Sequence, residues 1–479
     1  MKKRFKVIIV CMSAFVAFAA CTKNNGDEVK PGKDFDLGDG SVAYVLNENV
    51  TLSYPNTYHL QGFVYVPDGI TLTIEPGVVI KGDKETKGTL IVERGGKIMA
   101  KGSPQMPIVF TSAAAPGSRK AGDWGGIIIL GKAENNSGDM TIEGGVRSKH
   151  GGSDNADNSG VLSYVRCEFA GVEYTENNEI NGITFGSVGS GTKVDHIQVS
   201  YSGDDSYEWF GGAVNATHLV SLGCWDDDFD TDNGFSGKIQ FGVALRDALV
   251  ADKSSSNAFE SDNWSSGTPI DGKPTTRPIF ANISVFGPVT NPTNFVDQGS
   301  TNGSSVAVFQ SAVQIRRSSQ LNLFNSLLAG FPLGLIIEND KSGSNSQEMA
   351  TAGNSNVNNC VMAGMINNFQ DKATNTAPVY SPKNGDAFVK AYFTSASRGN
   401  RTLASVADLG LKGNPFTLKA PQMFPNMTSP LATGATWSHA NVSSWFVQTT
   451  YVGAFGVDEN ENNNWMSGWC NFDPQNTLY

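Results

Sequence analysis

The sequence is poor in charge, in histidine and in cysteine, and these shortages argue against several classes of protein. Charged residues make up only 17% of the 479 residues, and the formal net charge is −11. A nucleic-acid-binding protein needs a basic surface, so the acidic balance argues against a nucleic-acid partner. The six cysteines include no CxxC pair and the five histidines form no zinc-ligand motif, so the sequence does not predict a zinc site.

Long apolar runs and helical periodicity are missing after the first twenty residues. The segment Val7 to Ala20 is apolar and follows four cationic side chains, which is typical of a signal peptide and short for a membrane span. It ends in Phe18-Ala19-Ala20-Cys21, similar to the lipobox of bacterial lipoproteins, in which the cysteine becomes the acylated N-terminus. We predict a signal peptide over 1–20, lipidation of Cys21 and a flexible tether over 21–45; an ordinary secretory signal is the alternative.

Glycine, asparagine, serine and threonine are abundant, and they separate short strand-like segments. Gly62 to Gly69, Ile70 to Gly77 and Val78 to Gly82 alternate apolar and polar residues, with proline or glycine at their ends. Each apolar piece is about four residues long, which is too short for a sandwich strand. Such pieces fit one side of a solenoid rung.

A repeat in the middle of the chain supports a stacked solenoid. His196, Asp204-Asp205, Tyr207 and Glu208 recur 22 residues later as His218, Asp226-Asp227, Phe229 and Asp230, and Phe259-Glu260-Ser-Asp262-Asn263 repeats Phe229-Asp230-Thr-Asp232-Asn233 at an offset of 30. Later segments share an Asn-x-x-x-x-Gly frame that begins at Asn282, Asn325 and Asn359. Repeats this short predict β-solenoid rungs.

We therefore predict an all-β fold, a single-stranded right-handed parallel β-helix over 46–440 with loop excursions such as 135–159. The handedness follows from the general rule for parallel connections. Cys167 and Cys360 fall at inward positions and are expected in the core. Residues 441–479, with Trp445, Trp465 and Trp469, are expected to form an irregular cap over the open edge of the last rung.

The repeat also predicts a ladder of acidic side chains. If Phe229 points inward, alternation places Asp228, Asp230 and Asp232 on the outer face. Stacked rungs bring carboxylates to about 4.8 Å, where each pair repels by roughly 1 kcal/mol in water, so the ladder needs cations, hydrogen bonds or raised pKa values. The candidate metal ligands are Glu208, Asp228, Asp230, Asp232, Glu260 and Asp262.

Three interpretations of this ladder are open. It is a hydrogen-bonded structural stack, a Ca²⁺ site built from hard oxygen ligands, or a catalytic site that uses Asp227, Asp228 and Asp230. The last resembles polygalacturonase-type glycoside hydrolases, whose Gly-His-Gly and Arg-x-Lys elements are missing downstream. His196 and His218 are interpreted as stacked turn residues rather than general bases.

Three tryptophans lie near the ladder in the sequence. Trp209, Trp225 and Trp264 are candidates to stack on a glycan, because an exposed aromatic ring beside polar groups suits a sugar face. The alternative is that they fill corners of the solenoid.

Several phrases resemble a family of Bacteroidota surface lipoproteins. They are Leu-Thr-Ile-Glu-Pro-Gly-Val-Val-Ile-Lys-Gly (72–82), Gly-Asp-Trp-Gly-Gly-Ile (122–127), the two Asp-Asp phrases at 204–212 and 226–234, and Tyr-Val-Gly-Ala-Phe-Gly (451–456). The resemblance implies a pectin-lyase-like β-helix, anchored by lipid to the outer membrane and exposed on the cell surface. We expect a non-catalytic protein that binds glycan or a partner outer-membrane protein, with calcium as its candidate cofactor. The alternative is a polysaccharide lyase or glycoside hydrolase that acts at the acidic ladder.

Overall fold

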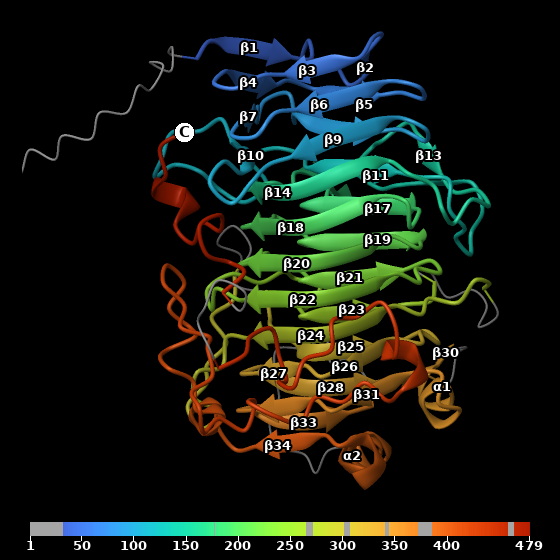
Figure 1. Cartoon of the computed structure of the whole chain (residues 1–479), viewed down its shortest axis with the longest axis vertical. Helices are drawn as coiled ribbons and strands as arrows, with labels where there is room; N and C mark the ends of the chain where they lie inside the picture. The colour runs from blue at the N-terminus through green and yellow to red at the C-terminus, as the bar shows by residue number, and fades with distance from the viewer. Residues whose placement is uncertain are drawn as a thin grey trace, which may run out of the picture. The chain divides into compact units, whose positions relative to one another are not determined.

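The computed structural model describes residues 32–176, 178–264, 272–300, 307–340, 344–371, 386–457 and 464–479. The predicted signal peptide and the lipidation site Cys21 lie outside these described residues. From Gly32 onward, short strands stack in parallel along one axis, as Figure 1 shows. Within the described residues, no helix has both the length and the apolar character needed to cross a membrane.

One parallel sheet, called sheet B, contributes one strand to each rung. Each of its strands is hydrogen-bonded to the equivalent strands of neighbouring rungs. In the described part of the chain its strands are β2 (Tyr44–Val45), β5 (Phe63–Val66), β8 (Thr89–Val92), β11 (Ile127–Leu130), β17 (Ile183–Val188), β19 (Tyr207–Gly212), β21 (Phe229–Asp232), β23 (Phe259–Ser261), β25 (Ser311–Ile315), β28 (Leu333–Ile337) and β33 (Asn367–Gln370).

A second parallel assembly, sheet A, supplies the other two faces of each rung. In the first rungs the two faces are separate strands. They are β3 (Val50–Leu52), β6 (Thr71–Ile74) and β9 (Lys97–Lys101) on one face, and β1 (Asp34–Leu37), β4 (Thr57–Leu60), β7 (Val79–Gly82) and β10 (Ile108–Ser112) on the other.

In the middle rungs one long strand spans both faces of sheet A. These strands are β14 (Gly160–Glu168), β18 (Lys193–Ser200), β20 (Asn215–Leu222), β22 (Lys238–Leu245) and β24 (Ile279–Phe286). The first half of β14 pairs with β9 and its second half with β10, which joins the two faces. The faces separate again into β26 (Asn322–Phe324) and β27 (Leu327–Ala329), then β31 (Asn356–Asn358) and β32 (Val361–Ala363), and end at β34 (Arg401–Leu403).

A row of left-handed residues bends the rungs between the two faces of sheet A. Seven residues at equivalent positions have φ between 50° and 61°, namely Tyr164, His196, His218, Phe241, Asn282, Asn325 and Asn359. This conformation is costly for most side chains and less so for asparagine. The aromatic members offset the cost by stacking, with ring centroids 4.3, 4.1 and 5.1 Å apart along Tyr164, His196, His218 and Phe241. The interpretation of the two histidines as stacked turn residues is therefore confirmed.

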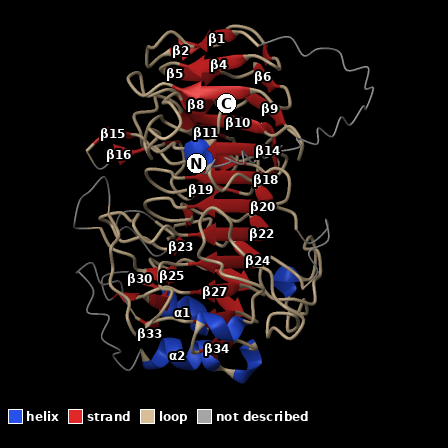
Figure 2. Ribbon diagram, turned by 90° about the vertical axis from the view of Figure 1, so that its left-hand side faces the viewer, coloured by secondary structure: helices blue, strands red, loops and turns tan. Residues whose placement is uncertain are grey.

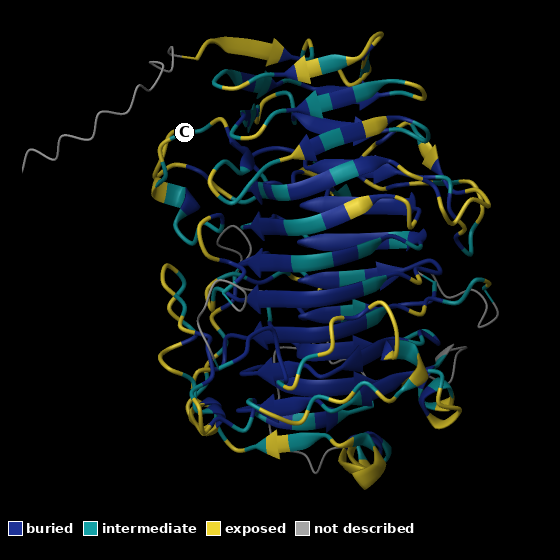
Figure 3. Ribbon diagram, viewed as in Figure 1, coloured by how far each residue is buried: buried dark blue, intermediate teal, exposed yellow. Residues whose placement is uncertain are grey.

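The interior of the solenoid is a continuous apolar column. Cys167 and Cys360 are buried in it as free thiols, as predicted. Its centre is aromatic, because Trp209 stacks between Phe185 and Phe235 with centroids 5.7 and 5.4 Å away. Figure 3 shows the buried strands in the middle of the stack and the exposed residues mainly in the peripheral turns.

Among the residues that the structure describes, three small hairpins and two α-helices lie outside the solenoid rungs. The hairpins are β12 (Met140–Thr141) with β13 (Lys149–His150), β15 (Glu173–Thr175) with β16 (Asn178–Glu179), and β29 (Asn339–Asp340) with β30 (Ser344–Asn345). The helices α1 (Ser346–Thr351) and α2 (Ala387–Thr394) lie near the last rungs, β33 and β34 (Figure 2). The predicted excursion at 135–159 contains the first hairpin.

The stacked fold begins earlier than the sequence predicted. Strands β1 and β2 pair in register with β4 and β5, and Phe35 stacks on Tyr58 at 5.7 Å. The tether expected over 21–45 is therefore too long, since residues from Asp34 onward already form rungs. These residues are mostly exposed and several are charged, so the sequence does not show the apolar alternation that indicates a strand.

The prediction of a terminal cap over the last rung is wrong. Helix α2 packs there instead, with Val389, Tyr392 and Phe393 in the core and with contacts to β33. Residues 464–479, called the strap, run back along sheet A toward the early rungs. Its Asn471 exchanges hydrogen bonds of 2.8 Å with Gln198, and its Tyr479 hydroxyl donates to Glu168 at 2.6 Å.

Candidate functional site

Seven carboxylates gather on the outside of sheet B and on the turns that enter it. We call Asp204, Asp205, Glu208, Asp226, Asp227, Asp230 and Glu260 the acidic cluster. Tyr207, Phe229 and Phe259 enter the core from β19, β21 and β23, so the next residue of each strand points outward. The parallel register places Glu208 beside Asp230 and Asp230 beside Glu260, which confirms the predicted stacking of these three acids.

The cluster can be described as three overlapping groups of oxygen ligands. They are Asp204 with Asp205 and Asp226, Asp205 with Glu208 and Asp230, and Asp227 with Asp230 and Glu260. Within each group the ligand atoms lie within 4.8 Å of one another. An ion equally far from three atoms at this limit lies about 2.8 Å from each, close to the 2.3–2.6 Å of Ca²⁺–oxygen contacts, so each group is about the size of one calcium site.

Hydrogen bonds between rungs hold several of these carboxylates in place. The backbone N–H of Asp227 donates to Asp205 at 2.7 Å, and the N–H of Asn257 donates to Asp227 at 2.5 Å. The amide of Asn181 donates to Glu208. The structural interpretation of the ladder is thus correct for part of it. By contrast, Oδ1 of Asp230 is buried and accepts no hydrogen bond from any described residue.

Burial is the largest cause of the raised pKa values in the cluster, and the neighbouring carboxylates are the second. Together they raise the pKa values of Asp205, Asp227 and Asp230 well above the ordinary aspartate value. They raise the pKa of Asp226 to about 7 and that of Glu260 to about 8, although Arg316 opposes the latter shift. The cluster therefore either retains protons near neutral pH or exchanges them for cations.

Asp228 does not lie on the outer face, contrary to the prediction. It precedes β21, where strand alternation does not yet apply, and its carboxylate turns inside. There it accepts a hydrogen bond of 2.5 Å from Ser221 and pairs with Arg246 at 3.4 Å, both charged side chains being 0% exposed. Its neighbour Asp227 occupies the ligand position instead.

At the far end of the ladder, arginine side chains neutralise the carboxylates. Arg316 pairs with Glu260 and with Asp262, the latter at 2.6 Å, and Arg317 pairs with Asp262 at 2.5 Å. Asp232 accepts a 2.5 Å hydrogen bond from the N–H of Asn233. Among the described residues, none of the metal-sized groups includes Asp228, Asp232 or Asp262.

Sequence reasoning missed the role of the turns that precede β19 and β21. Asp204 and Asp226 belong to the cluster, as does Asp205. The signal was the alignment of Asp204-Asp205 with Asp226-Asp227 at an offset of 22 residues. Equal positions in consecutive rungs are stacked neighbours, so both pairs had to lie together.

The three tryptophans proposed to stack on glycan have different environments. Trp209 is 0% exposed in the aromatic column, so it cannot meet a ligand and fills the interior instead. Trp264 is half-buried beside Gly272. Trp225 is half-buried and lines an open cleft of about 830 Å³ together with Phe169 and Tyr201.

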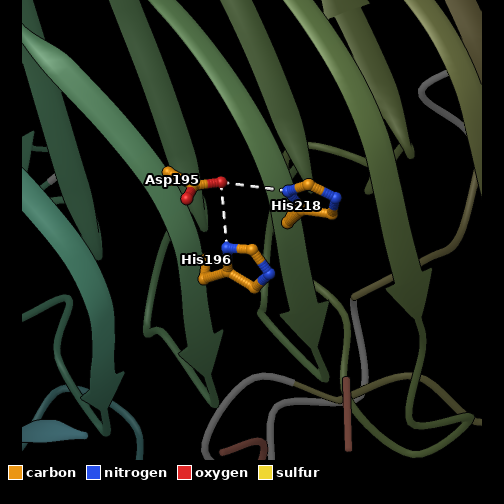
Figure 4. Close-up of side chains that lie close together, drawn as sticks. All are labelled: Asp195, His196 and His218. Atoms are coloured by element: carbon orange, nitrogen blue, oxygen red, sulfur yellow. Dashed lines mark hydrogen bonds and ion pairs between the residues drawn. The ribbon is translucent and has the colours of Figure 1, made fainter. Parts of the chain in front are cut away.

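A second titratable group, not predicted from the sequence, lies on the bent row of sheet A (Figure 4). Oδ1 of Asp195 lies 2.9 Å from Nδ1 of His196 and 3.0 Å from Nδ1 of His218. The imidazoles are only 19° from parallel, so a single ion cannot lie in the plane of both rings. Only His218 Nδ1 has the geometry of a hydrogen bond to Asp195, whereas His196 Nδ1 contacts the carboxylate without one. The carboxylate thus holds both stacked rings from one side.

Comparison with known proteins places this geometry in context. A family model described as a pectate-lyase-like beta helix domain matches residues 44–407, more than half of the chain. The crystal structure of pectate lyase Pel9A is similar with a TM-score of 0.35 and 14% sequence identity, over 82% of this chain and 89% of that chain. A search of curated protein sequences gave no significant match.

Proposed function

The chain belongs to the pectate-lyase-like β-helix family, and from that premise we propose that it is a non-catalytic, calcium-binding surface protein. It is anchored to the outer membrane through lipidated Cys21 and displays the β-helix on the cell surface. There it binds glycan, with a partner outer-membrane protein as the alternative ligand. The single observation that carries the proposal is the acidic cluster.

Calcium is the cation that this cluster suits best. All seven side chains offer carboxylate oxygens, which are the hard ligands that Ca²⁺ prefers. Their positions on three successive rungs mean that bound ions would join the rungs across sheet B. Asp230 belongs to two of the three groups and its Oδ1 has no hydrogen-bond partner among the described residues, so its carboxylate has most to gain from a cation.

The same residues support a binding role over a catalytic one. General acid–base chemistry at neutral pH commonly uses an imidazole near the reacting bond. In this chain, His196 and His218 belong to the bent row of sheet A and face Asp195, not the acidic cluster. Some of the carboxylates also accept hydrogen bonds from the backbone of the next rung, which fixes their positions as an ion site requires.

Thermal melting tests the calcium proposal. Calcium-free protein should melt at a lower temperature than protein in excess CaCl₂, and EDTA should reverse the gain, because a ligand of the native state stabilises it by mass action. The double variant Asp227→Asn/Asp230→Asn should lose the calcium response. Glu85→Gln, which changes an exposed acid away from the cluster, should keep it. An identical melting temperature with EDTA and with calcium would rule the site out.

A polysaccharide lyase remains the alternative function, and the family's fold is compatible with it. Of the three predicted catalytic acids, Asp227 and Asp230 remain together while Asp228 is buried with Arg246. Incubation with a panel of uronate-containing and neutral polysaccharides should release neither unsaturated products nor new reducing ends. Product that disappears in Asp230→Asn would establish the lyase instead.

The anchor can be tested separately from the site. Cys21→Ala should move the protein from the membrane fraction to the soluble fraction and abolish the incorporation of labelled palmitate. Protease added to intact cells should degrade the wild-type protein if its body faces outward. Retention of Cys21→Ala in the membrane, still labelled, would refute the lipidation site.

A further inference from the structure

The segment over residues 420–457 contains no Asp, Glu, Lys or Arg, whereas charged residues make up 17% of the whole chain. Within it, residues 437–449 form a loop whose ends are joined. The indole N–H of Trp437 donates a hydrogen bond of 2.8 Å to the carbonyl oxygen of Thr449. We call residues 437–449 the neutral loop. Compact loops closed in this way, known as Ω-loops, are frequently functional.

The neutral loop is fixed on the flank of sheet A. Gln240 of β22 donates to the carbonyl oxygen of Val447 at 2.7 Å and accepts from its N–H at 2.8 Å. Val442 and Phe446 are buried beneath the loop in an apolar cluster with residues of sheet A. The side chains that the loop turns outward are therefore presented by a well-held backbone.

Trp445 is the most conspicuous of these outward side chains. It is 42% exposed and its backbone is left-handed, with φ 73°. Its ring stands edge-on to Phe446, with centroids 4.9 Å apart and planes at 86°. A left-handed backbone is costly for a bulky residue, whereas glycine would adopt it without strain. Strain of this kind at an exposed aromatic residue points to a functional site.

Uncharged polar groups lie beside this ring in the chain. Ser443, Ser444 and Gln448 are exposed. Within the described part of the chain, the Trp445 indole N–H, the Ser444 hydroxyl and the Gln448 amide have no hydrogen-bond partner. An aromatic face among such groups suits a sugar ring, which offers C–H groups to the face and hydroxyls to the polar side chains.

The charge of the loop selects the class of ligand. Burial, together with the charges of Arg277 and Arg398, lowers the pKa of His439, so the neutral loop is uncharged near neutral pH. It has no cation to pair with a carboxylate. A protein partner would need a larger apolar area, since Trp445 and Val447 are the large exposed apolar side chains of the loop.

We propose that the neutral loop binds a neutral saccharide chain, one ring of which stacks on Trp445 while its hydroxyls meet Ser444 and Gln448. The inference rests on the glycan-binding part of the proposed function and gives it a location and a ligand class. The acidic cluster lies on the outside of sheet B, whereas the neutral loop lies on sheet A, so this binding does not require calcium.

Affinity electrophoresis tests the proposal. The wild-type protein runs in EDTA through gels that contain xyloglucan, galactomannan or hydroxyethyl cellulose, all neutral, with polygalacturonate as the charged comparison. At least one neutral polysaccharide should retard it, and polygalacturonate should retard it less. Trp445→Gly should raise the Kd at least about tenfold, because the stacking face is lost. Gln448→Ala should raise it about threefold by removing one hydrogen bond.

Two further variants separate binding from folding. Trp445→Gly should melt at the wild-type temperature or above it, because glycine relieves the left-handed backbone. Trp445→Phe keeps an aromatic face and should bind within about threefold of the wild type. The matched control is Met427→Ala, which removes a 74% exposed apolar side chain from the same uncharged segment outside the loop and should bind as the wild type does.

Four results would overturn the inference. They are no retardation in any of the three neutral gels, wild-type binding by Trp445→Gly, stronger retardation by polygalacturonate than by the neutral polysaccharides, and equal losses in Trp445→Gly and Trp445→Phe. Sedimentation velocity gives a fifth, since a dimer that Trp445→Gly abolishes would make the loop a protein interface instead.

The outcomes also separate this inference from the proposed function. Binding of polygalacturonate alone overturns the neutral loop and leaves glycan binding standing. Retardation that depends on Trp445, in a protein whose melting ignores calcium, supports the neutral loop and refutes the calcium site.

Discussion

Replacing Asp230 with asparagine should have opposite effects on stability without and with calcium. Asp230 lies in two of the three carboxylate groups, so its charge faces those of Asp205, Glu208, Asp227 and Glu260. Asparagine has nearly the same shape and removes the charge. Without a cation the variant should gain stability, because four repulsive pairs are relieved. With calcium it should lose stability, because an anionic ligand is missing.

The size of the effect follows from the spacing. Two unit charges at the outer limit of 4.8 Å repel by about 0.9 kcal/mol in water, and by about 3.5 kcal/mol at an effective dielectric constant of about 20. Partial protonation reduces the sum, since burial and the neighbouring acids raise the pKa of Asp230. We expect a gain of about 1–3 kcal/mol at pH 8 in EDTA. For a chain of this length, this raises the melting midpoint by roughly 1–3 °C.

The assay is a pair of melting series at pH 8, one in EDTA and one over increasing CaCl₂. Losing one carboxylate ligand should weaken calcium binding at least about tenfold, which removes about 1.4 kcal/mol of calcium stabilisation at a given concentration. The curves for wild type and Asp230→Asn should therefore cross as calcium rises. A variant that melts below the wild type in EDTA would refute the repulsion argument.

Three further predictions concern groups at different depths. In EDTA, the melting temperature should fall as the pH rises from about 5 to 8. The pKa is raised to about 7 for Asp226 and to about 8 for Glu260, so the folded state holds protons that the unfolded chain has already released. A melting temperature that stays constant or rises over this pH range would contradict this. Trp209→Ala should cost about 3–5 kcal/mol in urea unfolding, since the ring is wholly buried, and a cost under about 1 kcal/mol would contradict its place in the core. Arg246→Met should cost about 3–5 kcal/mol by leaving Asp228 buried and unpaired, and adding Asp228→Asn should restore part of the loss; no recovery would mean that the pair does not explain the cost.

The repeat in the sequence was sufficient to predict the fold and part of the site, because residues at equivalent positions of successive repeats are neighbours in a solenoid. Offsets of 22 and 30 residues became the strand register that stacks Glu208, Asp230 and Glu260. The same alignment placed the histidines at one bend. Within the strands, alternation correctly sent Phe229 inward and Asp230 outward.

The errors arose where the chain leaves the strands or where a contact spans many rungs. Asp228 stands one residue before β21, and a buried arginine drew its side chain inward. Arg316 follows β25, which pairs directly with β23, but it stands 54 residues after Asp262 in the sequence, so no local pattern revealed the neutralised end of the ladder. Trp209 was proposed as a binding residue because it is surrounded by acids in the sequence. Its own position in the strand points into the core.

The strap gives the solenoid an order of assembly. Rungs contact their neighbours, so the stack can form progressively while the chain is still being delivered from its amino-terminal side. The strap bonds join residues 273 and 311 positions apart, so they form only after every intervening rung has been delivered. Until then, Val220, Leu222 and Val243 on the flank of sheet A lack the cover of Trp465 and Trp469. Docking of the strap thus closes the flank of sheet A last, after the rungs that it crosses have stacked.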